Sequence, residues 1–258
     1  MAVAIDPEKE KRFLDEAQDI VRLGQERGIP LRLLGAIAVK LHCPGHRDLY
    51  AGMARALTDI DFVTYGKYNP LMQKFITVLG YQANERLIWM YGRSRHIYWS
   101  EEKGWQIDIF FDELNMCHKV NFRGRLDLDS PTIALGDILL EKMQIVRINA
   151  KDIKDTIIML LEHEVGQGDN ETVDLDHLVR TLAGDWGYYH TVTTNLAKTK
   201  EFLGEFAVLA AADRDVVAGR IDHVLAALEA APKSTRWKLR ARIGTRQKWY
   251  REVEEVSR

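Results

Sequence analysis

Three aspartates stand inside apolar runs of the first half of the sequence, where a strand ordinarily carries Ile, Val or Thr. Asp59 and Asp61 interrupt the run RALTDIDFV, and Asp108 interrupts the run GWQIDIFF. Because successive side chains of a strand point to opposite faces, Asp59 and Asp61 share one face. Carboxylates that are close together on a buried face repel each other unless a cation lies between them. The spacing therefore predicts a site for a hard divalent cation such as Mg²⁺, which takes oxygen ligands.

The chemistry of these residues depends on whether the two strands are neighbours in one sheet. If they are, three carboxylates face one pocket and can hold two metal ions, which activate an attacking oxygen and neutralise a phosphoryl leaving group. The alternative makes Asp59 a turn residue, Asp61 an exposed edge charge and Asp108 a solvent-facing residue of an antiparallel strand. A lone Asp-X-Asp tripeptide favours this alternative, whereas a third aspartate inside IDIFF favours the metal site.

A turn of small residues lies upstream, in the segment LLGAIAV at residues 33–39. Gly35 and Ala36 fall between an expected strand and the start of an expected helix. Backbone amides at a helix N-terminus are free to bind a phosphate, and a small side chain lets the phosphate approach. This signal is unspecific by itself.

The elements that position these residues follow from periodicity and from Gly, Pro and capping residues. In the first half, Asp6 and Pro7 begin a helix that Gly28 ends. The other elements expected there are strands at 31–34, 59–65, 96–99 and 105–111, helices at 37–42 and 70–79, and an irregular connection at 46–57. From Pro131 the pattern is helical, with helices expected at 133–148, 151–162, 174–182, 194–211, 214–229 and 235–255. The composition changes near residues 127–131, which predicts a domain boundary there.

Taken in order, these motifs resemble the nucleotidyltransferase fold of the DNA polymerase β superfamily. That family has a Gly-Gly or Gly-Ser turn, a strand with Asp-X-Asp and a later single Asp. The matching segments here are Leu34-Gly-Ala-Ile-Ala-Val39, Arg55 with Thr58-Asp-Ile-Asp61, and Gln106-Ile-Asp108. The run Ile138-Leu-Leu-Glu-Lys-Met143, with Arg147 and Lys151-Asp-Ile-Lys-Asp155, is similar to the lysine and Lys-Asp helices of the bacterial branch that includes abortive-infection toxin nucleotidyltransferases. The resemblance covers residues 31–162.

The resemblance implies an α+β nucleotidyltransferase fold with a small mixed β-sheet flanked by helices. Residues 1–128 would form the catalytic domain and residues 129–258 a helical domain. The implied activity is transfer of a nucleoside monophosphate from an NTP such as ATP to a hydroxyl of RNA or of a small molecule. Asp59 and Asp61 would bind two Mg²⁺ ions that bridge the triphosphate, and Asp108 would be the third ligand and the base-side carboxylate.

The resemblance also implies a set of nucleotide-binding residues. These are Gly35 and Ala36 through their backbone, Arg55, Lys142 and Lys151 as cations that offset triphosphate charge, and Asp152 as a residue that orients a lysine. Without the resemblance, Lys142 is a helix-surface cation, and Lys151 and Asp152 are a charge pair in a first helical turn.

Ala36 stands where the family has Gly or Ser, so a hydroxyl contact to phosphate is absent although the backbone amide remains. The interval from Gly35 to Asp59 is also longer than in minimal members. Ala36 supports a second interpretation, a catalytically lapsed nucleotidyltransferase-like protein that binds a nucleotide, an RNA or a partner protein.

Basic residues are concentrated near the C-terminus. The segment from Lys233 to Arg251 contains eight Lys or Arg and no acid, interleaved with Trp237, Trp249 and Tyr250. Such a segment suits an RNA backbone with stacked bases. It equally suits a helix whose tryptophans pack inward while Arg and Lys cover acidic helices.

The composition is that of a soluble protein of 258 residues with a net charge of −2, which gives no overall field that would imply nucleic acid or membrane. No apolar run approaches the roughly 20 residues of a membrane span. Two cysteines and a charged N-terminal region predict a reducing, cytoplasmic location. A zinc site lacks the usual ligand spacing, although its candidates would be His42, Cys43, His46, Cys117 and His118.

Overall fold

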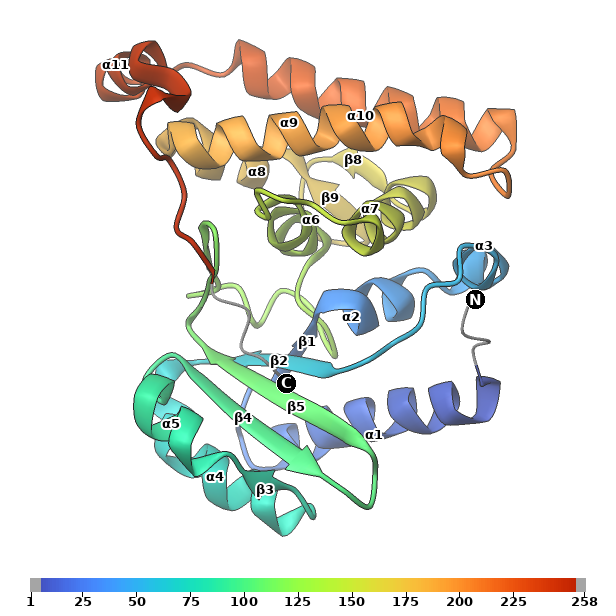
Figure 1. The fold of residues 1–258 in the computed structure, drawn as a ribbon, viewed down its shortest axis with the longest axis vertical. Coiled ribbons are helices and arrows are strands. Elements are labelled where there is room, and N and C mark those ends of the chain that lie inside the picture. The colour runs from blue at the N-terminus through green and yellow to red at the C-terminus, as the bar shows by residue number, and fades with distance from the viewer. Residues whose placement is uncertain (1–5, 254–258) are drawn as a thin grey trace. The chain divides into compact units, whose positions relative to one another are not determined.

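The chain has an α+β fold with a small mixed sheet in its first half and a helical C-terminal region, which confirms the expected fold class (Figure 1). The structure is a computed structural model that describes residues 6–253. These residues form two compact units. The sheet unit comprises residues 6–42, 54–114 and 120–134, and the helical unit comprises residues 43–53, 115–119 and 135–253. The last change of unit therefore lies between residues 134 and 135, whereas the sequence analysis placed the domain boundary between residues 128 and 129.

Five strands form the sheet, in the order β1-β2-β5-β4-β3. The central strands β2 and β5 are parallel, and every other neighbouring pair is antiparallel. The strands span Arg32–Leu34 (β1), Ile60–Thr64 (β2), Gln82–Ala83 (β3), Arg95–Ser100 (β4) and Trp105–Phe111 (β5). The short strands β6 (Glu113–Asn115) and β7 (Lys119–Asn121) make a separate two-stranded sheet.

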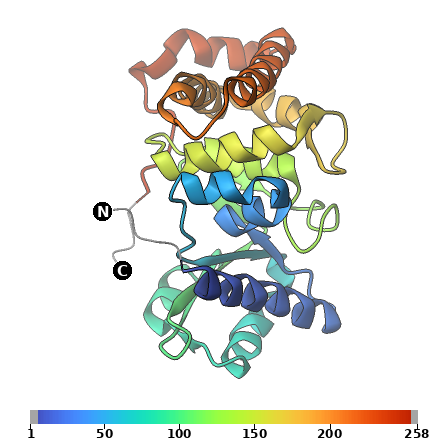
Figure 2. The same ribbon diagram turned by 90° about the vertical axis from the view of Figure 1, so that its right-hand side faces the viewer.

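One face of the sheet carries the hydrophobic core. Every second residue of the central strands is buried there, including Phe62, Ile107 and Ile109. Helices α1 (Pro7–Glu26) and α4 (Asn69–Val78) cover this face, and α1, drawn in dark blue, lies along the strands in both views (Figures 1 and 2). The side chain of Asp6 accepts hydrogen bonds from the first turn of α1, as the sequence predicts. The opposite face of β2 and β5 carries the aspartates.

Two further helices of the sheet unit lie next to its strands in the sequence. Helix α2 (Gly35–His42) follows β1 directly, and α5 (Glu85–Tyr91) precedes β4. The sequence analysis did not find α5, because its run LIWMY has no helical periodicity of apolar and polar residues. Its N-cap is Asn84, whose side chain accepts a hydrogen bond from the Leu87 amide at 3.2 Å.

The helical unit is built mainly from helices of the second half of the chain. Its helices are α3 (Arg47–Gly52), α6 (Leu135–Met143), α7 (Ala150–Glu162), α8 (Leu175–Gly184), α9 (Trp186–Phe202), α10 (Ala211–Ala230) and α11 (Thr235–Ile243). The strands β8 (Glu164–Gly166) and β9 (Thr172–Asp174) pair in parallel within it. Among residues 6–253, no helix has both the length and the apolar character that crossing a bilayer requires.

Three helices expected in this half, and one connection expected in the first half, have different bounds. The helix expected at 194–211 spans Trp186–Phe202 instead, and Asp185 caps it by accepting a hydrogen bond from the Tyr188 amide. The helix expected at 235–255 ends at Ile243, where Gly244 has a φ of 62°. Residues 254 and 255 of that prediction lie outside the described residues. The helix expected at 133–148 ends at Met143, and α3 lies within the connection expected to be irregular.

The core of the sheet unit yields a stability prediction. Ile107 is fully buried in the central strand β5, so Ile107→Ala should lower the free energy of unfolding by about 2–5 kcal/mol through lost burial and a residual cavity. Val78 is 71% exposed at the end of α4, and Val78→Ala should change it by less than about 0.5 kcal/mol. Urea unfolding of the full chain measures both, and equal effects would contradict the assignment of this face as the core.

Candidate active site on the sheet

Asp61 and Asp108 lie directly opposite each other on neighbouring strands. In the parallel pairing of β2 and β5, Asp61 is the register partner of Asp108. Residues that face each other in a sheet point to the same side, so both carboxylates are on the face opposite the core. The condition set by the sequence, that the two strands be neighbours, is met.

Asp59 joins this pair from the residue before β2 begins. It is two residues before Asp61 and therefore on the same side of the chain. Its negative charge is one of the influences that raise the pKa of Asp108, which places the two carboxylates within electrostatic reach of each other. The hydroxyl of Thr58 donates a hydrogen bond to Asp59 Oδ1 at 2.7 Å. Three carboxylates thus gather on one face, from two strands.

The carboxylate of Asp108 is buried and has two polar neighbours. Its exposure is 3%, Arg95 of β4 forms an ion pair with it, and Gln106 Nε2 donates a hydrogen bond to Oδ1 at 2.8 Å. Burial raises the pKa of Asp108, and Arg95 and Gln106 lower it without cancelling the effect of burial. Asp108 therefore holds a proton more readily than an exposed aspartate does.

Arg95 and Gln106 contact Asp108, and the sequence analysis assigned a role to neither of them. Ile97 is the register partner of Asp108, so Arg95, two residues before Ile97, shares the face of the aspartates. Its guanidinium carbon lies 5.1 Å from the ring centroid of Phe110, its own register partner. The alternation of the run RHIYWS in β4 is the only sequence signal that could have placed Arg95 on one face of the sheet. The antiparallel register of β4 with β5 cannot be read from the sequence.

The three aspartates fit a divalent cation by their chemistry, since hard cations take carboxylate oxygens. In the described residues their oxygen atoms do not all lie within 4.8 Å of one another. The Asp108 carboxylate is directed to Arg95 and Gln106. Arg95 thus supplies the positive charge that the buried carboxylate needs in this conformation.

The glycine turn lies at the same end of β2 as Asp59. Leu34 is the antiparallel partner of Asp61, so the next residues, Gly35 and Ala36, lead into α2 beside the start of β2. Gly35 has a φ of 74°, a conformation that costs other L-residues about 1–2 kcal/mol. Glycine is therefore needed here to turn the chain from strand to helix. Arg55, also of the sheet unit, is 6% exposed and donates a hydrogen bond to the Ala56 carbonyl.

The remaining predicted residues belong to the helical unit. Lys142 of α6 is 6% exposed, so its interpretation as a helix-surface cation is wrong. Its ammonium pairs with Asp155 at 2.9 Å and with Asp152 at 3.4 Å. Burial acts to lower the pKa of Lys142, but the nearby carboxylates, Asp155 first, outweigh it and hold the pKa above its usual value. Asp155 also accepts a 2.6 Å hydrogen bond from the Tyr50 hydroxyl.

Lys151 differs from Lys142 because it is exposed. It lies in the first turn of α7, where its backbone amide donates a hydrogen bond to the Asn149 side chain. Asn149, rather than Asp152, caps the helix. The structure therefore brings Asp152 to Lys142 and leaves Lys151 at the surface.

The aromatic residues of the basic C-terminal segment pack against α9. Trp249 donates a hydrogen bond from Nε1 to the Thr191 hydroxyl at 3.0 Å, and its ring meets His190 edge to face. Trp237 meets Tyr189 in the same way. These contacts correspond to the inward packing that the sequence left open, and binding of RNA by this segment stays a prediction.

The histidines considered for zinc have other partners, and both cysteines are free thiols. Burial lowers the pKa of His118 to about 4, so the ring is neutral, and it bonds the Thr191 hydroxyl at 2.8 Å. His46 pairs with Glu162 at 2.9 Å, and Cys43 is buried, which raises the pKa of its thiol. His42, in the sheet unit, lies 2.7 Å from the Thr132 hydroxyl.

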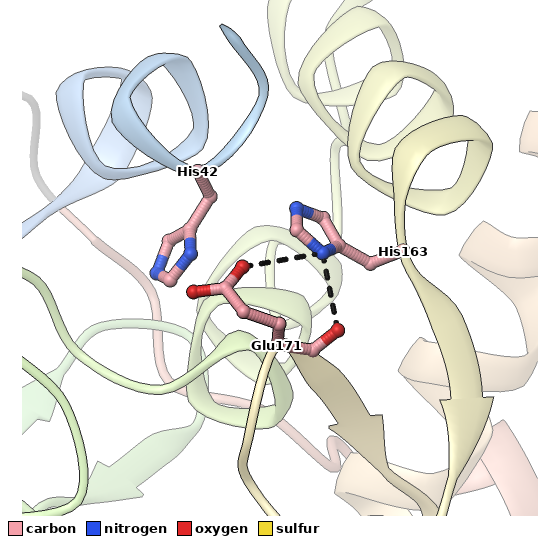
Figure 3. Close-up of side chains that lie close together, drawn as sticks. All are labelled: His42, His163 and Glu171. Carbon is pink, nitrogen blue, oxygen red and sulfur yellow. Dashed lines mark hydrogen bonds and ion pairs between the residues drawn. The ribbon is translucent and has the colours of Figure 1, made fainter. Parts of the chain in front are cut away.

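The helix expected at 151–162 ends at the expected residue, within the segment LEHEV at residues 161–165. Glu162 is the last residue of α7 and His163 is its C-cap. In the helical unit, His163 Nδ1 lies 3.2 Å from the carbonyl oxygen of Glu171 and 3.5 Å from its carboxylate (Figure 3). This contact joins the end of α7 to the residue before β9.

Comparisons with known proteins place the chain only distantly. No protein-family profile matches the sequence, and no curated protein does. The chain is similar to the antibiotic-resistance factor ANT(2'')-Ia, known from a solution structure, with 15% identity and a TM-score of 0.40. The alignment covers 85% of this chain and 96% of that chain. At this distance, the chain's own residues must carry the functional inference.

The Arg95 and Asp108 pair gives a second prediction. Arg95→Gln leaves a buried carboxylate without its cation, which should lower the free energy of unfolding by about 3 kcal/mol, the low end of the range for broken buried pairs because Arg95 keeps 23% exposure. The double variant Arg95→Gln/Asp108→Asn should recover most of this loss. Urea unfolding near neutral pH measures it, and a double variant no more stable than the single one would show that Asp108 is not the partner that matters.

The raised pKa of Asp108 gives a third prediction, on pH. Because the folded-state pKa lies above the ordinary 3.8, the ionised carboxylate costs folding stability. The cost is absent below 3.8, grows as the pH rises to the folded-state pKa, and is constant above it. Asp108→Asn should therefore be more stable than the parent at neutral pH, by a margin that shrinks as the pH falls toward about 4. Thermal unfolding across this range measures the margin, and one that widened on acidification would contradict the prediction.

Proposed function

We propose that the chain is a Mg²⁺-dependent nucleotidyltransferase that moves a nucleoside monophosphate from an NTP to a hydroxyl acceptor. The observation that carries this proposal is the register of β2 and β5, which sets Asp61 opposite Asp108 with Asp59 on the same face. The glycine turn into α2 lies beside the start of β2, as the order of motifs in the resemblance requires. Three carboxylates and a turn of small residues at one end of a sheet suit phosphoryl transfer.

Asp59, Asp61 and Asp108 would hold the metal ions. Bound there, two Mg²⁺ ions supply charge neutralisation for the triphosphate and lower the pKa of the attacking hydroxyl. Asp108 is also the proposed carboxylate that takes the proton of that hydroxyl. Arg95 and Gln106 orient its carboxylate.

The phosphates would meet the chain at the start of α2. The backbone amides of Gly35 and Ala36 are the proposed contacts, and the alanine methyl adds no hydrogen-bonding group. Arg55 is the proposed cation of the sheet unit. In the helical unit, Lys151 is exposed and available to a phosphate, whereas the charge of Lys142 is already matched by Asp152 and Asp155. We therefore propose that Lys142 and Asp152 act together to position the nucleotide site and do not contact the phosphates themselves.

The fourth prediction tests transfer directly. The full chain is incubated with each α-labelled NTP, Mg²⁺, and either bulk RNA or small hydroxylated acceptors. Label should pass from an NTP to an acceptor, and Asp59→Asn/Asp61→Asn should reduce the rate at least about a hundredfold, since a bound metal supplies several kcal/mol of transition-state stabilisation. Lys151→Ala should reduce it less, because an exposed cation contributes less than a metal ligand.

The alternative, a catalytically lapsed protein that only binds its ligand, predicts a different result for the same samples. Calorimetric titration with ATP, with and without Mg²⁺, measures binding independently of transfer. An active site should bind ATP more tightly with the metal, and Asp59→Asn/Asp61→Asn should remove that dependence. Binding that is unaffected by Mg²⁺ and by the variant, together with no transfer to any acceptor, would favour a protein that only binds its ligand.

A further inference from the structure

Helix α5 exposes an aromatic and apolar surface on the sheet unit. Trp89 is 87% exposed, Met90 50% and Tyr91 44%, and no residue of this helix is buried. Single exposed apolar residues are ordinary. Three consecutive ones, including a tryptophan, leave a large apolar area in water, and the protein forgoes the free energy that burying this area would give. Ile88 is the residue of the helix that packs against the core of the sheet unit. The composition of α5 is that of a binding surface.

Two arginines flank the exposed tryptophan. Arg86 lies three residues before Trp89 and on the same side of α5, and Arg93 lies in the turn that follows the helix. Both arginines are exposed, and within residues 6–253 neither has an ion-pair partner. The acidic Glu85 instead accepts a 2.8 Å hydrogen bond from Gln73 of α4. The surface therefore combines an exposed indole with two exposed arginines that have no ion-pair partner among the described residues.

A cavity of about 450 Å³ adjoins this surface. Its lining includes Asn69, Trp89, Tyr91, Arg93, Ser94 and His96. His96 is 4% exposed, and its Nδ1 lies 2.9 Å from the Tyr98 hydroxyl. Aromatic rings, an arginine and a buried imidazole around one hollow can receive a flat heterocycle and bond its polar edge.

We propose that α5, with residues 92–96, is a binding surface for single-stranded nucleic acid. Bases stack on aromatic rings whatever their sequence, and arginines on either side follow the phosphate backbone. We call this surface the α5 surface; its contact residues are Arg86, Trp89, Tyr91 and Arg93. It differs from the basic C-terminal segment, whose tryptophans pack against α9. The proposal requires no transferase activity.

Charge and length distinguish this partner from others. A protein partner would have to desolvate two arginines, which is unfavourable unless the partner supplies acidic residues to pair with them. A membrane surface binds amphipathic helices that are longer than the seven residues of α5. A nucleic acid strand supplies one negative charge per nucleotide and a stacking face per base, which matches the alternation of arginine and aromatic residues.

The fifth prediction is a binding measurement on the full chain. Fluorescence anisotropy of end-labelled oligo(rA), oligo(rU) and oligo(dT) is followed during titration with protein in EDTA, so that no transfer takes place. Trp89→Ala should weaken binding about tenfold, and Trp89→Phe, which keeps a stacking ring, should recover most of it. Arg86→Ser/Arg93→Ser should weaken binding and flatten the dependence of log Kd on log salt by about 1.4, or about 0.7 for each phosphate contact. Comparison of oligo(rU) with oligo(dT) shows whether RNA or DNA is preferred.

A matched control uses two exposed arginines outside both basic, aromatic segments. Arg12 and Arg47 are also exposed, and Arg12→Ser/Arg47→Ser removes the same charge from other parts of the chain. This variant should keep the affinity and the salt dependence of the parent. Trp89 is so exposed that its variants should fold, and their thermal midpoints should match the parent within about 2 °C.

Several results would overturn the proposal. They are absence of binding to all three oligonucleotides, equal affinity of Trp89→Ala and the parent, or loss of binding only in the Arg12→Ser/Arg47→Ser control. Size-exclusion chromatography and flotation with anionic vesicles are run without oligonucleotide. Association of chains or vesicle binding that depends on Trp89, with no oligonucleotide binding, would assign the surface to a protein or lipid partner instead. Because the assay contains no NTP or metal, failure of transfer leaves this result unaffected.

Discussion

The parallel pairing of β2 with β5 is the constraint on which the site depends. This register brings Asp61 opposite Asp108, and like charges directly opposite each other in a sheet are unfavourable. Burial of Asp108 adds a desolvation cost, which its raised pKa reflects. The chain offsets part of this cost with Arg95 on the next strand. A cation site needs negative charge that the protein has not neutralised, and such charge costs folding stability. A site that was already neutral would gain little from a metal.

The two faces of the sheet carry different kinds of residue. Each central strand alternates, so Phe62, Ile107 and Ile109 fill the core under α1 and α4 while the aspartates between them face the other way. Burial on one side stabilises the strands enough to hold unfavourable charge on the other. The same alternation fixes the register strongly, since a slip by one residue would turn the aspartates into the core.

The sequence specified the local features well. The alternation predicted β5 at the bounds the structure shows, Asp6 and Pro7 predicted the start of α1, and the two-residue spacing predicted the shared face of Asp59 and Asp61. The features it did not specify are long-range. Arg95 reaches Asp108 through strand pairing, and Tyr50 reaches Asp155 across 105 positions, so neither partner is marked by spacing. The start of α9 was missed because Trp186 and Gly187 are poor helix formers, although Asp185 was a readable cap.

The two segments that combine tryptophan with basic residues differ in the exposure of their rings. Near the C-terminus, Trp237 and Trp249 are interleaved with arginine and lysine, yet their rings make edge contacts with α9 and the indole of Trp249 donates to Thr191. At α5, Trp89 has the same basic neighbours and remains exposed. Composition alone therefore could not separate the two segments, because it counts aromatic and basic residues without showing which rings have neighbours. A ring already in contact with the fold has lost the face that a base would use, whereas an exposed ring between unpaired arginines has kept it.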